Sequence, residues 1–368
     1  MIRASLILPA LLLTAGTIAA PMMASSPALA ADDVSAEKVA ETYAALLQSD
    51  YVYPETGERY AAALRAGIVA GRYVSLTGEA LGQAIDRDVN AVSPDGHLRL
   101  RVPETAAANG AVAGGAASTP RPPKVPVEQA GWIAPGIAFV RFNVFPMDAD
   151  VSAQAAKFMA DHADAKAIIF DIRTHNGGGL DQMDVIFPWL FDQETRLVTM
   201  ATRASVDARG GSPIAGLPSM RRAEGDAGMV TREHWATPNT DVRLRDAKVY
   251  VLTSGASASA AEHFALAMKH TRRGTLVGAP TAGANHFGRG EELGGGYRAF
   301  IPVGRTYDPV TGKDWEGNGV QPDIAVAPAE ALLRVLTDLG VAPGEAKRLS
   351  DAHMPSWPME RRRPRPGR

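Results

Sequence analysis

The sequence predicts an α/β protein with a mostly parallel sheet, preceded by a small helical domain. In the N-terminal part, apolar residues recur at three- and four-residue intervals, which is typical of helices. After Gly131, short apolar runs alternate with helical stretches, which is typical of parallel strands joined by helices. The composition of the 368 residues, 46% apolar and 21% charged with no cysteine, excludes a disordered or disulfide-stapled chain.

Residues 1–30 have the pattern of an export signal. Arg3 precedes a long apolar run without charge, and Ala28-Leu29-Ala30 supplies the small residues of a cleavage site. We expect a mature chain that begins at Ala31, lies in the periplasm or outside the cell, and has no stable membrane insertion. A retained membrane anchor is the alternative, but prolines shorten the run below the roughly 20 residues that a span needs.

The mature chain divides by composition into four parts. Residues 31–102 form the helical domain, which closes at Ser93-Pro94-Asp95-Gly96, and this turn delivers His97 onto a short strand at 98–102. Residues 103–130 are rich in Ala, Gly and Pro and predict a linker. The α/β core follows at 131–345, and a basic, disordered tail is expected at 346–368.

Each element of the core is expected from a local pattern. Helix 328–339 begins at Pro328, whose missing N–H has no helical partner at a first position. Residues 202–246 carry glycines, prolines and mixed charges without a period, and we expect loops there that could form a lid. Apolar runs predict strands at 137–142, 167–172, 248–252, 275–277 and 297–302, and helical periodicity predicts helices at 153–162, 180–191 and 260–272.

Charge and motifs exclude several functional classes. The net charge of −2 gives no global field that would attract nucleic acid. No His-Glu-x-x-His or other clustered His/Asp spacing occurs, so the sequence predicts neither a metal site nor a cofactor.

The strongest local signal is a strand that runs into a small-residue turn and then a helix with Ser259 at its start. A serine there can present its oxygen to a substrate while the free N–H groups of the first helical turn face an oxyanion. On this segment alone a structural interpretation is favoured, because Ser259-Ala260-Ala261-Glu262 fits a capping box.

A second signal is the run Asp171 to Gly179, in which a buried-looking strand ends in three consecutive glycines before a helix. Gly177 and Gly178 can turn their N–H groups toward a ligand. The spacing is not that of a phosphate-binding loop, and a plain turn remains the alternative.

Two histidines and a glutamate lie in turns where they could take part in chemistry. His97 follows Asp95-Gly96, His286 follows Gly283-Ala284-Asn285, and Glu316 stands in a glycine-rich turn beside an aromatic residue. A lone loop histidine is usually just a solvated residue, and a glutamate in a surface turn would show the same pattern.

Taken in order, these segments resemble the tail-specific, or C-terminal processing, serine peptidases. The branch they resemble most contains the repeats of interphotoreceptor retinoid-binding protein and the core of tricorn protease. The resemblance runs from Tyr51-Val52-Tyr53-Pro54 through Asp95-Gly96-His97-Leu98 and the Ser259 turn to Gly319-Val320-Gln321-Pro322-Asp323. It implies a crotonase-like spiral core and an exported peptidase that acts on peptide or protein substrates.

The resemblance also implies roles for the residues above. Ser259 is the nucleophile, His97 its base, Glu316 the carboxylate that orients His97, and Ala260 with Gly177 or Gly178 forms the oxyanion hole. His286 is the reserve candidate for base or substrate binding. One departure matters, because Ala284 follows Thr281-Ala282-Gly283 where the processing peptidases carry a catalytic lysine, so the Ser/Lys dyad is absent.

No stretch resembles the PDZ insert of the processing peptidases. A non-catalytic protein that binds an apolar ligand or a peptide on the same scaffold is the main alternative, and acyl chemistry of the crotonase type is a weaker one. Substrate identity, any need for a free C-terminus and the oligomeric state stay open.

Overall fold

The computed structural model describes residues 34–98, 100–103 and 124–360. The expected export signal, residues 104–123 of the expected linker and the last eight residues of the tail lie outside the described residues. None of the helices in the described part of the chain combines the length and apolar character needed to cross a membrane.

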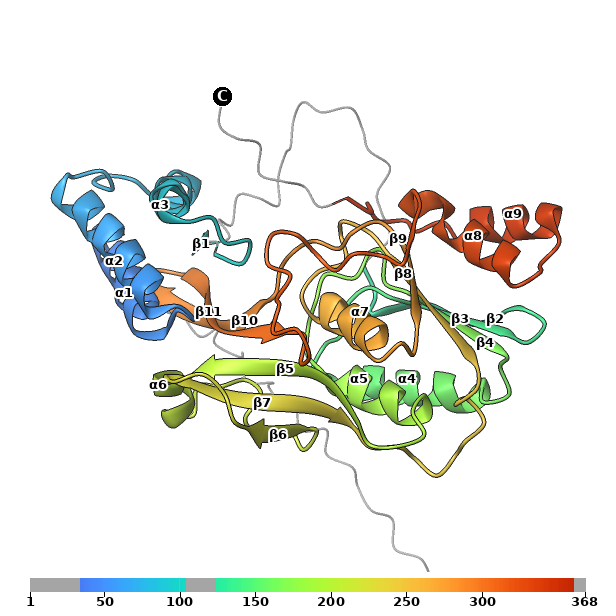
Figure 1. Ribbon diagram of the computed structural model, residues 1–368. Helices are drawn as coiled ribbons and strands as arrows, with labels where there is room; N and C mark the ends of the chain where they lie inside the picture. Colours follow the sequence, from blue (N-terminus) through green and yellow to red (C-terminus); the bar gives the residue numbers. More distant parts are fainter. Residues whose placement is uncertain (1–33, 99, 104–123, 361–368) are drawn as a thin grey trace, which may run out of the picture.

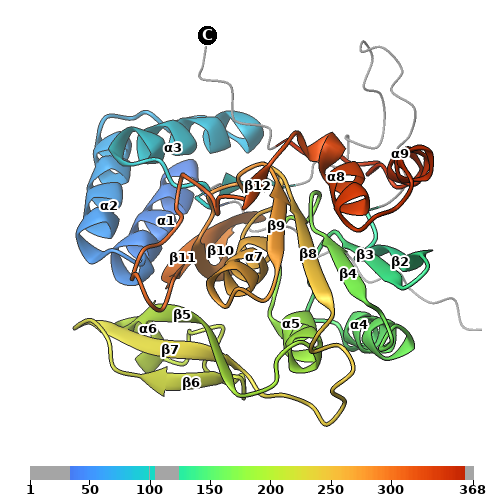
Figure 2. The ribbon, with the colours of Figure 1, turned by 45° about the vertical axis from the view of Figure 1, so that its right-hand side comes forward.

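A six-stranded sheet, here called the core sheet, positions the glycine loop and Ser259. β2 pairs antiparallel with β3, and every other neighbouring pair is parallel, as Figure 2 shows. The expected mostly parallel sheet is therefore confirmed, with β2 and β12 added at its edges. In spatial order the strands are β12 (Ile324–Ala325), β9 (Thr275–Gly278), β8 (Lys248–Thr253), β4 (Ala167–Asp171), β3 (Ile137–Phe142) and β2 (Val127–Ala134).

Helices cover both faces of the core sheet because its strands alternate between two apolar clusters. Ile168 and Phe170 of β4 belong to one cluster, and Ala167 and Ile169 belong to the other. The first face is covered by α4 (Ala149–Asp161), α5 (Asp181–Ile186) with the 3₁₀ turn η2 (Phe187–Trp189), and α7 (Ala260–His270). The second face is covered by α8 (Ala331–Asp338), which follows the 3₁₀ turn η3 (Pro328–Glu330), and by α9 (Pro343–Ala352).

A second, antiparallel sheet lies beside the core sheet (Figure 1). Its strands run in the order β1 (Leu100–Arg101), β11 (Tyr297–Tyr307), β5 (Thr195–Arg203), β7 (Met229–Ala236) and β6 (Met220–Ala223), and β10 (His286–Gly294) also pairs with β11.

The expectation of loops over residues 202–246 is therefore wrong, since these residues hold β6, β7 and the short helix α6 (Ala204–Ala208). The strand β7 could not be recognised from the hydrophobicity of its sequence, because some of the side chains that it buries are polar. Arg232 is neutralised by Asp207 at 2.7 Å, and His234 contacts Asp184 at 2.9 Å. Both buried groups have partners that only the folded chain supplies.

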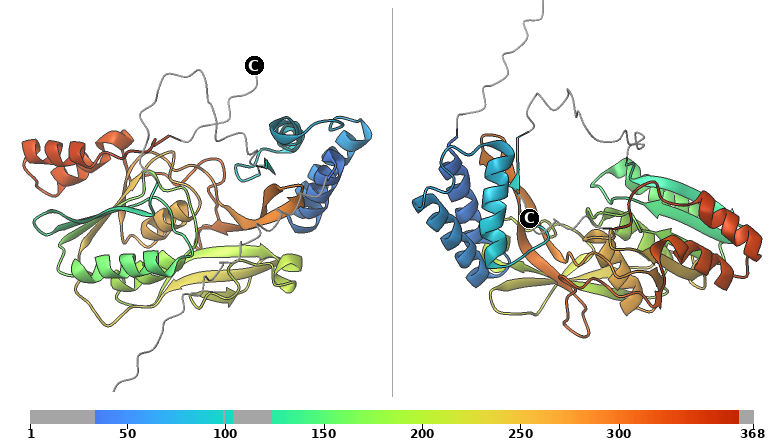
Figure 3. Two further views of the ribbon diagram at one scale, coloured as in Figure 1. Left: turned by 180° about the vertical axis from the view of Figure 1, so that it is seen from behind. Right: turned by 90° about the horizontal axis from the view of Figure 1, so that it is seen from above.

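Three helices precede the sheets: α1 (Ala36–Asp50), α2 (Pro54–Val69) and α3 (Gly78–Val92). Their apolar faces share one cluster with Leu293 of β10 and with Ile301 and Val303 of β11. The helical part therefore packs on the second sheet and has no separate core of its own. Seen from above in Figure 3, these helices and the α8–α9 pair lie at opposite ends of the molecule.

The disordered tail was expected to begin at residue 346, which lies inside an ordered helix. The helix α9 continues to Ala352, and Ala346 and Leu349 are buried against the core sheet. Residues 346–352 are therefore part of the fold, and the prediction was wrong for them because one turn of buried side chains is too short to show a period.

Candidate active site

Ser259 stands at the N-terminus of α7 in a strained backbone conformation. Its φ of 56° and ψ of −114° are unusual for a residue with a Cβ, and among the described residues only Ser75 and Arg272 also combine a side chain with positive φ. Such strain persists only where surrounding structure enforces it, and it is common at reactive sites. The conformation leaves the side chain partly exposed at the mouth of the helix.

The loop before Ser259 is tied to the loop that follows β4. The hydroxyl of Ser257 donates to the carbonyl of Ile172 at 2.8 Å, and the N–H of Ala258 donates to the carbonyl of His175 at 2.9 Å. A Cβ at Gly177 would lie 3.0 Å from the Cβ of Ser259. The two segments that the sequence singled out separately, 171–179 and 254–262, are therefore in contact and are called the nucleophile region below.

Two backbone N–H groups of the nucleophile region are available to an oxyanion. The N–H of Ala260 belongs to the first residue of α7 and has no helical acceptor. Gly178 donates no backbone hydrogen bond within the described residues, whereas the N–H of Gly177 donates to Nδ1 of His175 at 3.1 Å. Of the two glycines, Gly178 is therefore the one whose N–H is free.

Gly178 is also irreplaceable on steric grounds. Its φ is 130°, and a Cβ there would lie 2.0 Å from the carbonyl oxygen of Phe145. Hydrogen bonds of the flanking residues keep Gly178 close to Phe145: the N–H of Phe145 donates to the carbonyl of Gly177 at 3.0 Å, and the N–H of Gly179 donates to the carbonyl of Phe145.

His175 lies beneath the glycine loop as a buried, neutral imidazole. Burial lowers its pKa to about 3, and the positive charge of Lys124 acts in the same direction. Its ring meets Phe145 edge-on, with centroids 4.3 Å apart. Since Nδ1 accepts the N–H of Gly177, the proton of the neutral ring is on Nε2.

Glu262 connects the helix of Ser259 to the loop that leads to His286. Its buried carboxylate accepts the N–H of Ser259 at 2.8 Å, the N–H of Gly283 at 2.7 Å and the N–H of Ala284 at 2.9 Å. Burial raises the pKa of Glu262, although these hydrogen bonds oppose that shift. The Glu262 half of the capping box is thus present, and the N–H of Glu262 also donates to the carbonyl of Ser259 at 2.8 Å.

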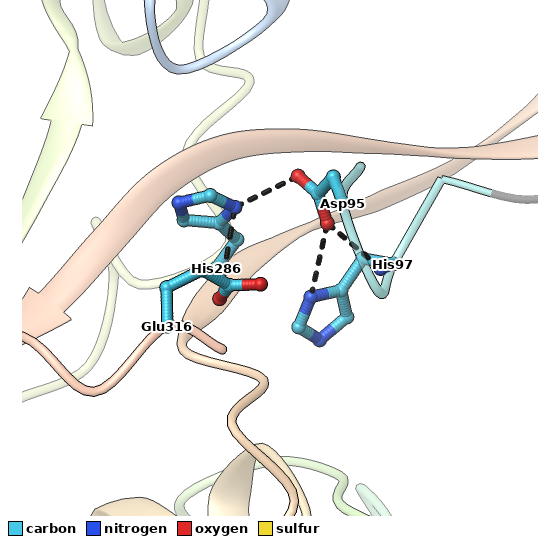
Figure 4. Close-up of side chains that lie close together, drawn as sticks. All are labelled: Asp95, His97, His286 and Glu316. Atoms are coloured by element: carbon cyan, nitrogen blue, oxygen red, sulfur yellow. Dashed lines mark hydrogen bonds and ion pairs between the residues drawn. The ribbon is translucent and has the colours of Figure 1, made fainter. Parts of the chain in front are cut away.

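Asp95, His97, His286 and Glu316 form a second group, called the histidine–carboxylate cluster (Figure 4). Nδ1 of His286 donates to Oδ2 of Asp95 at 2.8 Å and lies 3.9 Å from Oε2 of Glu316. Nδ1 of His97 is 3.7 Å from Oδ1 of Asp95. Asp95 and His97 come from the loop between α3 and β1, His286 begins β10, and Glu316 precedes β12.

Opposite charge governs the protonation of this cluster. Burial alone would raise the pKa of Asp95, but the hydrogen bond from His286 and the neighbouring ring of His97 hold that pKa below its ordinary value. Burial alone would lower the pKa of His286, but the hydrogen bond to Asp95 and its charge raise it. The hydroxyl of Tyr51 also donates to Asp95 at 2.9 Å.

The structure thus brings the expected residues into two groups. Ser259, Ala260, Gly177 and Gly178 lie together, and His97, His286 and Glu316 lie together. Within the described residues, no hydrogen bond joins the hydroxyl of Ser259 to a histidine. Glu316 contacts His286 and accepts the N–H of Asn285 at 2.7 Å, and the carboxylate within 4 Å of His97 is that of Asp95.

Sequence reasoning missed the roles of Asp95 and Glu262. Asp95 was assigned to a turn, and its place two residues before His97 was the available signal, because a side chain at that spacing can fold back on its neighbour. Glu262 was recognised only as a cap, and no local pattern indicates that it also binds the loop at Gly283.

A buried ion network anchors the glycine loop to the core sheet. Asp171, at the end of β4, pairs with Arg173 and with Arg141 at 2.8 Å each, and all three side chains are almost fully buried. Burial acts to raise the pKa of Asp171, but the charges of the two arginines outweigh it and lower the pKa to about 2. The first residue of the glycine loop is therefore held in place by a buried network of ion pairs.

Comparisons with known proteins concern the family and the fold of the chain. Residues 136–326, more than half of the chain, match the family model described as Peptidase family S41. Among solved structures, a photosystem II D1 C-terminal processing protease is similar with a TM-score of 0.54 and 16% identity, over 86% of this chain and 98% of that one.

Two further solved structures are similar over most of their length. A protein from Parabacteroides merdae proposed to be a peptidase has a TM-score of 0.57 and 16% identity, over 85% of this chain and 99% of that one. A lipoprotein from Streptococcus agalactiae has a TM-score of 0.51 and 13% identity, over 83% of this chain and 96% of that one. At such identities these similarities concern the fold.

Proposed function

The chain belongs to peptidase family S41, and we propose that it hydrolyses peptide bonds with Ser259 as nucleophile and His97 as general base. Membership makes it a serine-type peptidase, a hydrolase whose substrates are peptides or proteins. The roles of individual residues are the part that we propose.

The observation that carries the proposal is the conformation of Ser259 beside two available N–H groups. The strained serine at the start of α7 lies against Gly177, and the N–H groups of Ala260 and Gly178 have no protein acceptor in the described structure. Donors fixed in this way stabilise the negative charge that develops on a carbonyl oxygen during attack, and one such donor contributes about 10²–10³ in rate.

In the proposed reaction the oxygen of Ser259 attacks the peptide carbonyl carbon and His97 takes the hydroxyl proton. The tetrahedral oxyanion accepts hydrogen bonds from Ala260 and Gly178. His97 then protonates the leaving amine, and water hydrolyses the acyl-enzyme by the same steps. His97 must come within hydrogen-bond distance of Ser259 for the transfer, and such contacts often form only in the substrate complex.

The geometry divides the orienting role between two carboxylates. Asp95 is the carboxylate next to Nδ1 of His97, and a carboxylate in that position stabilises the imidazolium formed during the reaction. Glu316, which the resemblance makes the orienting residue, contacts His286 and the N–H of Asn285. We assign Asp95 to His97 and Glu316 to His286.

Two finer features belong to the proposal. Ala284 in place of the catalytic lysine supports a His-based enzyme of the tricorn-like and retinoid-binding-protein-like branch. Export to the periplasm or beyond is supported by the composition of residues 1–30.

Labelling with a fluorophosphonate, which reacts with activated serines, tests the proposal on the purified mature protein. We expect labelling of the wild type, none of Ser259→Ala, and a rate lower by about 10²-fold or more in His97→Ala, because general-base catalysis supplies that factor. Ser75→Ala, which changes the other described serine with positive φ, is the matched control and should label at the wild-type rate.

Other outcomes overturn specific parts. If labelling survives in His97→Ala but is lost in His286→Ala, the general base is His286 and not His97. No labelling of a folded wild-type protein contradicts the activated nucleophile and favours a non-catalytic binding protein on the same scaffold.

A further inference from the structure

The histidine–carboxylate cluster has the composition of a transition-metal site. Two imidazoles and two carboxylates each offer one ligand atom, and the four atoms all lie within 4.8 Å of one another. In the described part of the chain, no other group of three or more such side chains gathers in this way. Asp95 and His286 are buried, whereas His97 and Glu316 are partly exposed, which leaves the group reachable by a small ion.

The distances suit a zinc ion. Zn²⁺ binds imidazole nitrogen and carboxylate oxygen at about 2.0–2.2 Å, so tetrahedral ligand atoms stand roughly 3.3–3.6 Å apart. The separations here are 2.8 Å from His286 to Asp95, 3.7 Å from His97 to Asp95 and 3.9 Å from His286 to Glu316. His286 faces Oδ2 of Asp95 whereas His97 faces Oδ1, and the four ligand atoms lie within 4.8 Å of one another, so the side chains must draw together around an ion to reach the tetrahedral spacing.

The ligand atoms have few competing partners and are oriented by their surroundings. Nδ1 of His97 is buried without a hydrogen-bond partner, and Nδ1 of His286 bonds to Asp95, itself a candidate ligand. Three donors orient the carboxylates: the hydroxyl of Tyr51 and the backbone N–H of His97 on Asp95, and the N–H of Asn285 on Glu316. Outer contacts of this kind are typical of metal sites.

We propose that the cluster binds one Zn²⁺ through His97, His286, Asp95 and Glu316, and that the bound ion reversibly inhibits the peptidase. The two nitrogen ligands favour zinc over Mg²⁺ and Ca²⁺, which prefer oxygen. Coordination displaces the proton held between His286 and Asp95. It also occupies Nδ1 of His97, so that the remaining proton of that ring is on Nε2, which can then donate but not accept.

The inhibitory part rests on the proposed function, because it requires His97 to be the base. The binding part does not, since it concerns only the four side chains. The two parts are therefore measured separately.

Binding is measured on Ser259→Ala, which is expected to be inactive and keeps the whole cluster. Isothermal titration with zinc sulfate, in the presence of a competing chelator, should give one Zn²⁺ per chain, and magnesium chloride should give none. Glu316→Gln and His286→Gln in the same background should each bind at least about tenfold more weakly. Zinc should raise the melting temperature of Ser259→Ala and raise that of the two double variants less.

A matched control separates this site from adventitious binding. His270→Gln removes another histidine with a carboxylate neighbour, Asp308 at 4.0 Å, and should bind zinc like its parent. Absence of zinc binding by Ser259→Ala overturns the proposal. Binding that is unchanged by both cluster substitutions also overturns it, because the ion is then elsewhere.

Inhibition is measured as the rate of fluorophosphonate labelling of the wild type with zinc and after chelation. We expect at least a tenfold lower rate at saturating zinc and full recovery with the chelator. Zinc binding without any change in labelling overturns the inhibitory part. A metal-free wild type that never labels is a failure of the proposed function instead, and the titration of Ser259→Ala still decides the site.

Discussion

The nucleophile region and the histidine–carboxylate cluster are built in different ways. The nucleophile region is held by short contacts that end on backbone carbonyls: the N–H of Ala258 and the hydroxyls of Ser254 and Ser257 donate to carbonyls of residues 172–175, and Gly178 admits the carbonyl of Phe145. The cluster is held by side chains from three separate segments, and its central pair, Asp95 and His286, is 191 positions apart.

The difference indicates that the histidine–carboxylate cluster can rearrange more easily than the nucleophile region. Backbone contacts at the ends of parallel strands are fixed by the sheet itself, so the oxyanion donors are in place before substrate arrives. Side-chain contacts between loops can change partners at small cost. We therefore expect substitutions in the nucleophile region to act through geometry and those in the cluster to act through charge.

Gly178→Ala should have the largest effect, because its Cβ would meet the carbonyl oxygen of Phe145 at 2.0 Å and force the loop to move. Loss of one oxyanion donor predicts a labelling rate lower by about 10²–10³. Gly210→Ala, also at a positive φ (73°) but with open space around it, is the control and should keep the wild-type rate. Equal rates for the two variants would contradict a fixed backbone at Gly178.

Asp95→Asn and Glu316→Gln distinguish the two carboxylates of the cluster. Asp95→Asn should lower kcat about 10²-fold, since it removes the charge beside Nδ1 of His97, whereas Glu316→Gln, which acts through a neighbour, should lower kcat by roughly tenfold. Steady-state kinetics on a peptide substrate, with circular dichroism to confirm folding, measures both. The reverse order would return the orienting role to Glu316.

The smallest expected effect is a pH dependence of stability from His175. Its pKa is lowered to about 3 in the fold, while the unfolded chain has the ordinary value of about 6.5. The neutral buried ring therefore makes its full contribution to the free energy of unfolding above pH ~6.5. This contribution is lost as the pH falls from about 6.5 toward 3, by about 1.4 kcal/mol per pH unit.

Urea unfolding of the wild type and of His175→Gln between pH 7 and pH 5 measures this slope. The variant should lose less free energy of unfolding on acidification than the wild type. His270→Gln, a histidine nearer the surface, should retain the wild-type slope. Identical slopes for wild type and His175→Gln would show that the ring beneath the glycine loop is not held neutral.

Much of the core could be read from the sequence because its signals are local. Five strands were expected close to their observed positions, and the helix after Ser259 was located by its small-residue turn and cap. The second sheet could not be read over residues 202–246, since Arg232 and His234 interrupt the apolar pattern and their partners, Asp207 and Asp184, lie outside the strand.

The sequence by itself determined the strand–loop–helix units that carry Ser259 and the three glycines, because propensity, capping and turn chemistry act within about ten residues. It also contained the motifs of the family. Only the tertiary structure decided which N–H of the glycine loop is free, that Glu262 links Ser259 to Ala284, and that Asp95 is the carboxylate beside His97. Those facts depend on hydrogen bonds between segments far apart in sequence, and no local pattern specifies such a pairing.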